Sequence, residues 1–184
     1  MAVNNNEREG LLAIGTLLSN GKYRIEQYLS SGGFGNTYVA TDLAFDEKVA
    51  IKELYIKGVC GRNEATNEVA ITLTENQRTF EAQREKFRKE ARRLRRLSNA
   101  HIVKVHDLFD ENGTSYYVMD FIEGESLGAR IKRMGHPMSP ADVMLTLPQI
   151  LDALETVHND GIWHLDMKPG NIMIDRKGNI QLID

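Results

Sequence analysis

Features that define specialised protein classes are scarce or missing in this sequence. It has a single cysteine, Cys60, so an intrachain disulfide and a cysteine-rich zinc site are excluded, and the cytoplasm is the expected location. No apolar run approaches the roughly 18 residues of a membrane span, and the first residues lack the basic stretch and apolar core of a secretory signal. We therefore expect neither a membrane span nor secretion.

Neither sign of charge is in large excess. The 23 Lys and Arg residues are balanced by 26 Asp and Glu residues, which gives a formal net charge of −3 at pH 7. This balance argues against a surface built throughout to neutralise nucleic-acid phosphates, so no nucleic-acid partner is expected. The chain has 184 residues, 41% of them hydrophobic, which is enough for the cores of one large or two small domains.

The first two thirds of the chain predict an antiparallel sheet and one long helix. Apolar and polar residues alternate over residues 22–54, which indicates strands, and a glycine-rich turn interrupts them at residues 30–35. A polar stretch follows that we expect to be an irregular surface loop, and a capping-box pattern at residues 74–77 then starts a helix that ends near Leu97. Two more strands are expected at residues 102–109 and 115–122, with a turn between them at residues 110–113.

The last third of the chain predicts a long helix and a short hairpin. Ser139 and Pro140 form the start of a helix in which apolar residues recur at helical spacing as far as Val157. Pro148 lies within this pattern, and because it removes a backbone donor we expect it to kink or interrupt the helix. A closing hairpin is expected at residues 171–184, with its turn at residues 176–179.

Two features of the predicted sheet suit phosphate binding. Gly32, Gly33 and Gly35 lie in a turn between strands, where glycines let the backbone approach an oligophosphate closely. A glycine-rich hairpin without a ligand explains this pattern equally well. Lys52 shares a strand face with the apolar Ala50, where an unpaired ammonium group would be costly. The alternative is a lysine at a sheet edge that extends to water.

The predicted helix supplies a partner for Lys52. Glu90 lies between Phe87 and Leu94 on the apolar stripe, so we expect its carboxylate on the buried side, where an ion pair would hold the Lys52 ammonium against a phosphate. The eight Lys and Arg residues at 84–96 mostly lie elsewhere around this helix. They predict a solvated outer face with i,i+4 ion pairs in preference to a nucleic-acid-binding surface, whose affinity would fall with salt.

The most specific pattern lies near the C-terminal end of the sequence. Asp166 is placed to accept a proton from an attacking hydroxyl, and Lys168 to hold a phosphoryl group in transfer. A hairpin centred on residues 177–178 would place Asn171 and Asp184 opposite each other at its open end. An amide oxygen and a carboxylate suit Mg²⁺, which prefers oxygen ligands.

These motifs, in this order, resemble the eukaryotic-type protein kinase family, and within it the serine/threonine branch, over residues 22–184. The resemblance implies ATP as phosphoryl donor, Mg²⁺ as cofactor and a protein serine or threonine as acceptor. It implies an α+β fold, with an N-lobe of antiparallel sheet and one main helix, and an incomplete, mainly helical C-lobe. The implied catalytic residues are Lys52, Glu90, Asp166 and Lys168, and the implied Mg²⁺ ligands are Asn171 and Asp184. Nucleotide contacts are implied for Gly32, Gly33, Gly35, Thr37, Ala50, Lys52, Met119, Asp120, Ile122 and Met173.

Several positions depart from the family pattern. Ser30 stands in place of the first glycine of the loop and Thr37 in place of a valine, which would alter phosphate closure and adenine packing without excluding ATP. Many family members have an arginine at the position of Leu165, and that arginine contacts a phosphorylated activation loop. We therefore do not expect phosphorylation of that loop to switch the activity of this protein. Lys168 followed by Pro169 favours serine/threonine over tyrosine specificity, and Lys168 with the glycine loop favours a protein kinase over a small-molecule phosphotransferase.

The resemblance also predicts domain boundaries and a truncation. We expect an N-terminal extension at residues 1–21, an N-lobe at 22–122 with an insertion at 55–79, and a hinge with a partial C-lobe at 123–184. Asp184 would open the family's Asp-Phe-Gly motif, so an apolar stripe on the long C-lobe helix would lack its cover and favour a homodimer or a swapped assembly. A weakly active or inactive kinase fragment is expected, with a non-catalytic nucleotide-binding pseudokinase or scaffold as the alternative.

Overall fold

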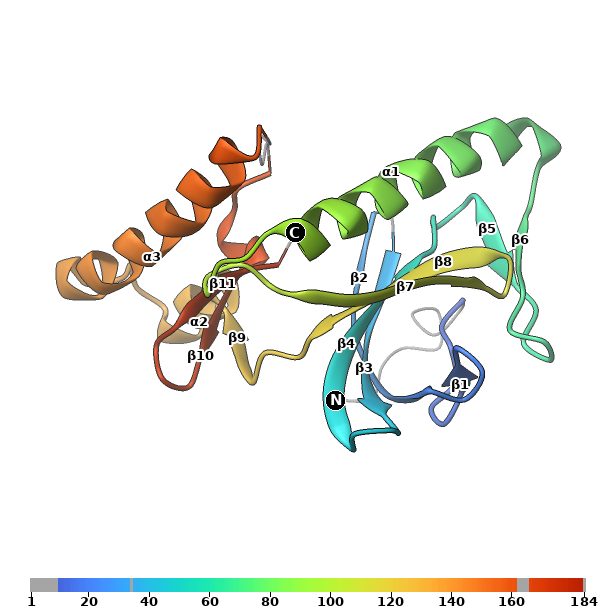
Figure 1. The fold of residues 1–184 in the computed structure, drawn as a ribbon, viewed down its shortest axis with the longest axis horizontal. Helices are drawn as coiled ribbons and strands as arrows, with labels where there is room; N and C mark the ends of the chain where they lie inside the picture. The colour runs from blue at the N-terminus through green and yellow to red at the C-terminus, as the bar shows by residue number, and fades with distance from the viewer. Residues whose placement is uncertain (1–9, 34, 162–165, 184) are drawn as a thin grey trace. The chain divides into compact units, whose positions relative to one another are not determined.

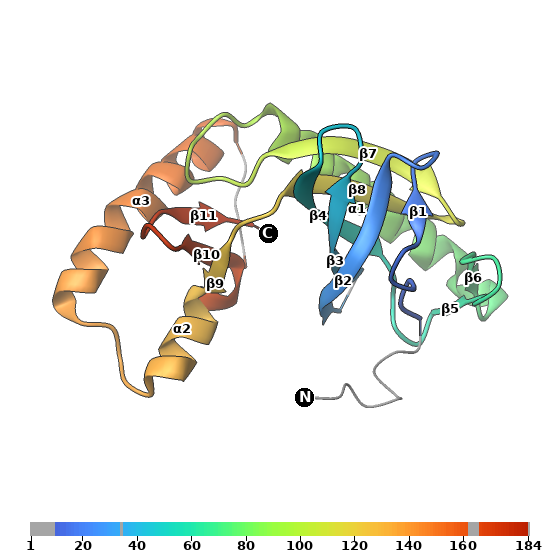
Figure 2. The same cartoon turned by 90° about the horizontal axis from the view of Figure 1, so that it is seen from below.

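The computed structural model describes residues 10–33, 35–161 and 166–183, and the chain divides into two compact units. The first unit contains residues 1–92 and 105–121, and the second contains residues 93–104 and 122–184. Figures 1 and 2 show the elements of each unit. No helix in the described part of the chain is long and apolar enough to cross a membrane.

A six-stranded antiparallel sheet forms the first unit, in the strand order β1-β2-β3-β4-β8-β7 (Figure 1). It confirms the strands predicted on both sides of the glycine-rich turn and the pair predicted later in the chain. Asn112 and Gly113 have φ of 51° and 72° between the last two strands, as a two-residue hairpin turn requires. The strands are β1 (Leu17–Leu18), β2 (Tyr23–Gly32), β3 (Gly35–Asp42), β4 (Glu47–Leu54), β7 (Val105–Glu111) and β8 (Thr114–Asp120).

Helix α1 (Gln77–Arg96) packs on one face of this sheet. Its apolar residues Phe80, Phe87 and Ala91 are buried, which confirms the predicted apolar stripe. The ring of Phe87 contacts that of Tyr117 in β8, with 4.8 Å between the centroids. The residues of the expected capping box instead form a short 3₁₀ helix (Thr74–Asn76) that leads directly into α1.

A hydrophobic core covers the opposite face of the sheet. Val49 and Ile51, which alternate with Lys52 along β4, point into this core and are buried. Leu12 and Leu18, from the segment before β2, are buried in the same core, and β1 pairs with β2. The described residues before position 22 therefore contribute to the core of the first unit.

The polar stretch before α1 is not the irregular loop that we expected. It contains an antiparallel hairpin formed by β5 (Cys60–Arg62) and β6 (Val69–Ile71), and Cys60 is buried. The backbone N–H of Val69 donates to the carbonyl of Asn112, which ties the hairpin to the β7–β8 turn. Strands of only three residues carry too little alternation to be seen in the sequence.

Helices and a three-stranded antiparallel sheet, in the order β11-β10-β9, form the second unit. The closing hairpin confirms the prediction, whereas α2 and β9 were not predicted. Ser126 and Gly135 cap α2: the Ser126 hydroxyl accepts from Ala129 N–H, and Gly135 takes φ of 71°. The elements are β9 (Gly124–Ser126), α2 (Leu127–Met134), α3 (Pro140–Asn159), a 3₁₀ helix (Pro169–Asn171), β10 (Ile172–Asp175) and β11 (Ile180–Leu182).

Helix α3 begins as predicted but is not interrupted. The Ser139 hydroxyl accepts from the Asp142 N–H at 3.1 Å, and Pro140 occupies the first turn. Pro148 lies inside the continuous helix, so it does not interrupt α3. Its ring deprives the carbonyl of Met144 of a donor four residues on, and Met144 is 69% exposed, so water can satisfy that carbonyl.

One face of α3 carries an exposed apolar stripe, as predicted. Val143, Leu147 and Leu151 recur at four-residue spacing and are 39%, 42% and 55% exposed, whereas Ala153 and Val157 of the same helix are buried in the core of the second unit. Large apolar side chains in contact with water favour association with another apolar surface. The exposed apolar residues of α3 are Val143, Met144, Leu145, Leu147 and Leu151.

Candidate active site

The pairing of β4 with its two neighbours places the candidate nucleotide residues of the first unit. Lys52 lies opposite Thr37 of β3 and Tyr117 of β8, and Ala50 lies opposite Met119. Residues opposite each other in a sheet present their side chains to the same face, so this group shares the face on which α1 packs.

Lys52 and Glu90 form the ion pair that the sequence predicts. The Lys52 Nζ donates to Glu90 Oε1 at 3.4 Å, and the Tyr117 hydroxyl donates to the same oxygen at 2.9 Å. Tyr117 thus orients the carboxylate, although the sequence analysis did not single it out. Its ring also lies 5.6 Å from the ammonium nitrogen.

Glu90 is not on the buried side of α1, which corrects our expectation. Its side chain is 42% exposed, whereas the Lys52 side chain is 18% exposed. Position 90 follows the buried Phe87 by three residues and precedes the half-buried Leu94 by four, so it lies at the margin of the apolar stripe. The carboxylate therefore keeps part of its hydration while it contacts Lys52.

The glycine-rich turn joins β2 to β3, and its glycines differ in what they do. A Cβ at Gly35 would lie 2.3 Å from the carbonyl oxygen of Glu53, so the packing of β3 against β4 requires glycine there. A Cβ at Gly32 or Gly33 would meet no atom within 4 Å, and neither residue has a positive φ. Neither packing nor backbone strain within the described residues accounts for these two glycines.

The second unit brings together two of the predicted catalytic residues and one of the predicted Mg²⁺ ligands. Lys168 Nζ donates to Asp166 Oδ2 at 2.7 Å, and Asn171 Nδ2 donates to the same oxygen at 3.0 Å and to the Asp166 carbonyl at 3.0 Å. Asn171 is buried at the end of the 3₁₀ helix, whereas the Asp166 and Lys168 side chains are 65% and 55% exposed. This loop holds a solvent-accessible carboxylate beside an ammonium group.

The register of the closing hairpin differs by one residue from our expectation. Ile172 pairs with Leu182, and the Ile183 N–H donates to the Asn171 carbonyl at 3.1 Å, so Asn171 lies opposite Ile183. The turn closes around Asp175, whose Oδ1 accepts from the N–H groups of residues 177 and 179. Asp184, expected opposite Asn171, lies outside the described residues.

The remaining predicted nucleotide contacts are divided between the units. Asp120 ends β8, where Oδ1 lies 2.5 Å from His106 Nε2, and both residues belong to the first unit. Ile122 belongs to the second unit, as does Met173, which pairs with Ser126 and Gln181 in the small sheet.

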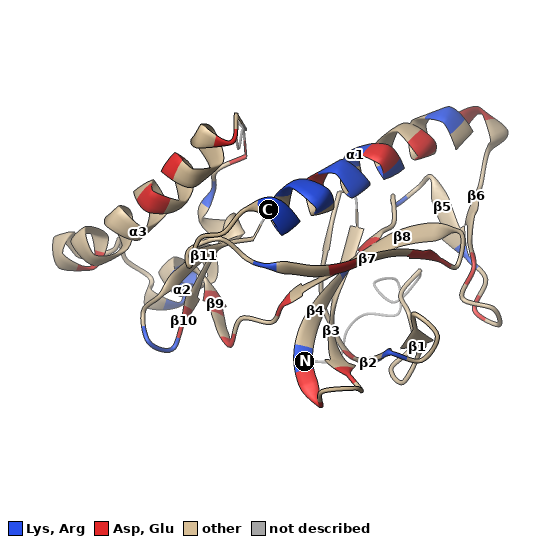
Figure 3. Ribbon diagram, in the orientation of Figure 1, with Lys and Arg blue, Asp and Glu red and all other residues tan. Residues whose placement is uncertain are grey.

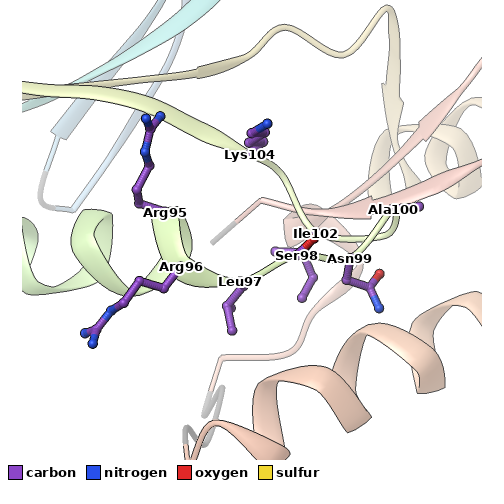
Figure 4. A pocket seen from close by; sticks show the side chains of 8 residues that line it. All are labelled: Arg95, Arg96, Leu97, Ser98, Asn99, Ala100, Ile102 and Lys104. Carbon is purple, nitrogen blue, oxygen red and sulfur yellow. The ribbon is translucent and has the colours of Figure 1, made fainter.

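Basic side chains gather along the second half of α1 (Figure 3). Arg84 and Arg88 form i,i+3 ion pairs with Glu81 and Glu85, where the sequence analysis expected i,i+4 pairs. A hollow of about 380 Å³ lies at the C-terminal end of the helix, in the second unit, but the side chains of its basic residues point in different directions (Figure 4). They do not converge on one anion. The hollow is lined by Arg95, Arg96, Leu97, Ser98, Asn99, Ala100, Ile102 and Lys104.

Comparison with known proteins identifies the family. A family model described as "Protein kinase domain" matches residues 23–184. Serine/threonine-protein kinase PrkC of Bacillus subtilis (strain 168) is 33% identical over 173 residues, which are 94% of this chain and 24% of PrkC. Serine/threonine-protein kinase PksC of Streptomyces coelicolor is 32% identical over 179 residues, 92% of this chain and 28% of PksC.

Solved structures show the same fold. A structure named "PpkA-294 apo form" superposes with a TM-score of 0.90 at 28% identity, and covers 95% of this chain and 61% of its own. The kinase domain of Mycobacterium tuberculosis PknI has a TM-score of 0.71 at 22% identity, with 95% and 61% covered, and at that identity the likeness concerns the fold alone.

The chain belongs to the protein kinase domain family, and its α+β fold is a kinase fold. Within that family, its relatives PrkC and PksC are serine/threonine-protein kinases, so the predicted family and branch are confirmed. The chain spans about a quarter of the length of these two relatives and 61% of the PpkA chain.

Proposed function

We propose that the full-length protein is a serine/threonine protein kinase that transfers the γ-phosphoryl group of ATP to a hydroxyl of a protein. The observation that carries this proposal is the Lys52–Glu90 ion pair in a chain of this family, oriented by Tyr117. Catalysis of phosphoryl transfer depends on positioning and electrostatic stabilisation, and an ammonium held in place supplies both.

In this proposal the first unit supplies most of the nucleotide contacts. Gly32 and Gly33 leave space in which a phosphate can approach the backbone, which explains glycines that packing does not require. Lys52 contacts the α and β phosphates and Glu90 keeps its ammonium in place. The proposed contacts with the rest of the nucleotide are Gly35, Thr37, Ala50, Met119, Asp120, Ile122 and Met173.

The second unit performs the transfer in this proposal. The substrate hydroxyl oxygen forms a bond to the γ-phosphorus while the bond to the β,γ-bridging oxygen breaks, so that ADP leaves and the hydroxyl proton passes to Asp166. Lys168, whose ammonium lies 2.7 Å from Asp166 Oδ2, is placed to neutralise charge on the moving phosphoryl group.

The side chain of Asn171 suits Mg²⁺ as one ligand. Asn171 Nδ2 is engaged by Asp166, which leaves an amide oxygen as a hard ligand, and the proposed second ligand is Asp184. A bound Mg²⁺ would neutralise negative charge on the phosphates. Within the described residues no group of three or more His, Cys, Asp or Glu side chains forms a metal site on its own.

The proposal extends to partners and location. The acceptor is a serine or threonine of a protein, since Lys168 is followed by Pro169 and the named relatives are serine/threonine kinases. A cytoplasmic location agrees with the reduced, buried Cys60. Residues 1–184 alone are expected to be weakly active or inactive and to self-associate through the exposed stripe of α3.

Nucleotide binding tests this proposal. Titration of the full-length protein with a non-hydrolysable ATP analogue should show binding that strengthens with Mg²⁺. Lys52→Met should weaken it by about tenfold or more, because a charged hydrogen bond is lost. Lys48→Met is the matched control, since Lys48 lies on the same face of β4 and is exposed. An affinity unaffected by Lys52→Met contradicts the assigned phosphate contact.

A further inference from the structure

A fully buried carboxylate lies next to Lys52 in the sequence but on the other face of β4. The Glu53 side chain is 0% exposed, and four donors surround it. Oε1 accepts from Arg62 Nη2 at 2.6 Å and from the Tyr116 hydroxyl at 2.8 Å. Oε2 accepts from the Tyr38 hydroxyl at 2.9 Å and from Asn36 Nδ2 at 3.2 Å. The two carboxylate oxygens are therefore satisfied without water.

Arg62 connects this carboxylate to two segments outside the sheet. Its side chain is 2% exposed, Nε donates to the Gly10 carbonyl at 2.9 Å, and Nη1 donates to the Asn67 carbonyl at 2.8 Å. The pKa of Arg62 is raised because attraction to the Glu53 carboxylate outweighs the effect of burial. The β5–β6 hairpin and the N-terminal segment are thus fastened to β4 by one charged side chain.

Asn36 continues the network into the glycine-rich turn. A carboxylate only accepts hydrogen bonds, so Glu53 fixes the Asn36 amide with its nitrogen inward and its oxygen toward the turn. That oxygen accepts from the Ser31 hydroxyl at 2.9 Å, and the Ser31 hydroxyl lies 2.7 Å from the Tyr28 hydroxyl. Ser31 and Asn36 are paired across β2 and β3, directly beside Gly32 and Gly35.

The network can hold only one arrangement of the turn at low cost. Loss of a hydrogen-bond donor to a buried carboxylate strongly destabilises the folded state. Rearrangements that separate Glu53 from any of its four donors are therefore unfavourable. Burial and the nearby Glu53 carboxylate raise the pKa of Tyr38 and of Tyr116, so both hydroxyls remain donors. Gly35 lies too close to the Glu53 carbonyl for any side chain to fit, so this end of the turn packs directly against the backbone of residue 53.

We infer that Asn36, Glu53 and Arg62 are positioning residues that hold the glycine-rich turn in the conformation that receives the nucleotide phosphates. The insertion at residues 55–79 then supports the nucleotide site through Arg62. This inference rests on the proposed function, which places the phosphates at that turn.

Tyr38 provides a control for the network. Its hydroxyl donates to the same oxygen of Glu53 as Asn36 does, but no hydrogen bond leads from it to Ser31. A role in stability alone would make Tyr38→Phe and Asn36→Ala equivalent. A role in positioning makes only Asn36→Ala affect the turn.

The experiment compares hydrogen exchange and nucleotide affinity in these variants of the full chain. Asn36→Ala should speed amide exchange at residues 30–32 and 35–37 by about tenfold and weaken binding of an ATP analogue by about fivefold. Tyr38→Phe also removes a donor from Glu53 and should lower the melting temperature, but it should change exchange at the turn and nucleotide affinity by less than about twofold, because the Asn36–Ser31 hydrogen bond remains. Equal effects of the two variants, or no effect of Asn36→Ala on exchange, would overturn the inference.

A double variant distinguishes loss of positioning at the turn from simple unfolding. Arg62→Met alone leaves the buried Glu53 carboxylate without its cationic partner and should lower the melting temperature. Glu53→Met combined with Arg62→Met replaces the ion pair by apolar groups and should restore the melting temperature. Exchange at the turn should stay fast in the double variant because Asn36 has lost its carboxylate acceptor and keeps only the longer contact with the Gly10 carbonyl, at 3.4 Å. Slow exchange there would contradict the inference. Wild-type protein that binds no nucleotide would contradict the proposed function instead, while the exchange data would still show whether the network holds the turn.

Discussion

At the scale of single residues, the arrangement around Lys52 depends on a hydroxyl. The Tyr117 OH and the Lys52 ammonium meet at the same oxygen of Glu90, a carboxylate that is 42% exposed. An exposed ion pair contributes little by itself, because water competes for both charges. The second donor gives the carboxylate one preferred orientation.

Removal of that hydroxyl should therefore affect nucleotide use more than folding. Tyr117→Phe keeps the ring that packs 4.8 Å from Phe87, so the melting temperature should change little. The KM for ATP of the full-length protein should rise by about threefold to tenfold, which corresponds to the loss of one ordinary hydrogen bond, since the carboxylate is partly hydrated. Tyr23→Phe is the control, since the Tyr23 hydroxyl donates to Asp107 elsewhere in the sheet. An unchanged KM for Tyr117→Phe would show that the hydroxyl does not orient the pair.

The residues that the sequence analysis found and those that it missed differ in a physical way. Lys52 stood out because a charge on an apolar strand face requires an explanation. Glu53 did not stand out, although it lies on a strand face with Val49 and Ile51, because its partner Arg62 comes from a hairpin that was expected to be a loop. Long-range pairing of this kind leaves no periodic signal in one sequence.

At the scale of elements, local patterns predicted well wherever they were long. The strands around the glycine-rich turn, α1 and the start of α3 follow from alternation, helical spacing and the Ser139 cap. Pro148 does not interrupt α3, and the carbonyl that it leaves without a donor belongs to an exposed residue of the helix. The hairpin register was wrong by one residue because Asp175 accepts two backbone N–H groups and so sets the turn.

Helix α3 carries a prediction of its own. Val143, Leu147 and Leu151 recur at four-residue spacing on one face of α3 and are 39%, 42% and 55% exposed, so this chain should form dimers or larger assemblies through that face. Leu147→Glu should shift the mass measured by size-exclusion chromatography with light scattering to that of a monomer. Ala141→Glu, at an exposed position in the first turn of α3, should leave the assembly intact. A monodisperse wild-type monomer at high concentration would remove the proposal.

At the scale of the whole molecule, two compact units each carry part of the machinery that the family resemblance implies. The first holds the Lys52–Glu90 pair and the glycine-rich turn, and the second holds the Asp166, Lys168 and Asn171 cluster. A purely structural module has no need of either set. The presence of both sets favours an enzyme over the alternative of a nucleotide-binding scaffold.

The most direct test of that claim is phosphoryl transfer by full-length protein carrying Asp166→Asn. The account predicts that wild-type protein phosphorylates serine or threonine in a protein substrate in the presence of ATP and Mg²⁺. It also predicts that Asp166→Asn loses this activity by a factor of about 10² or more while it still binds the ATP analogue, because the proton acceptor is lost and the phosphate contacts remain. Full activity in the variant, or nucleotide binding without any transfer by the wild type, would contradict the account.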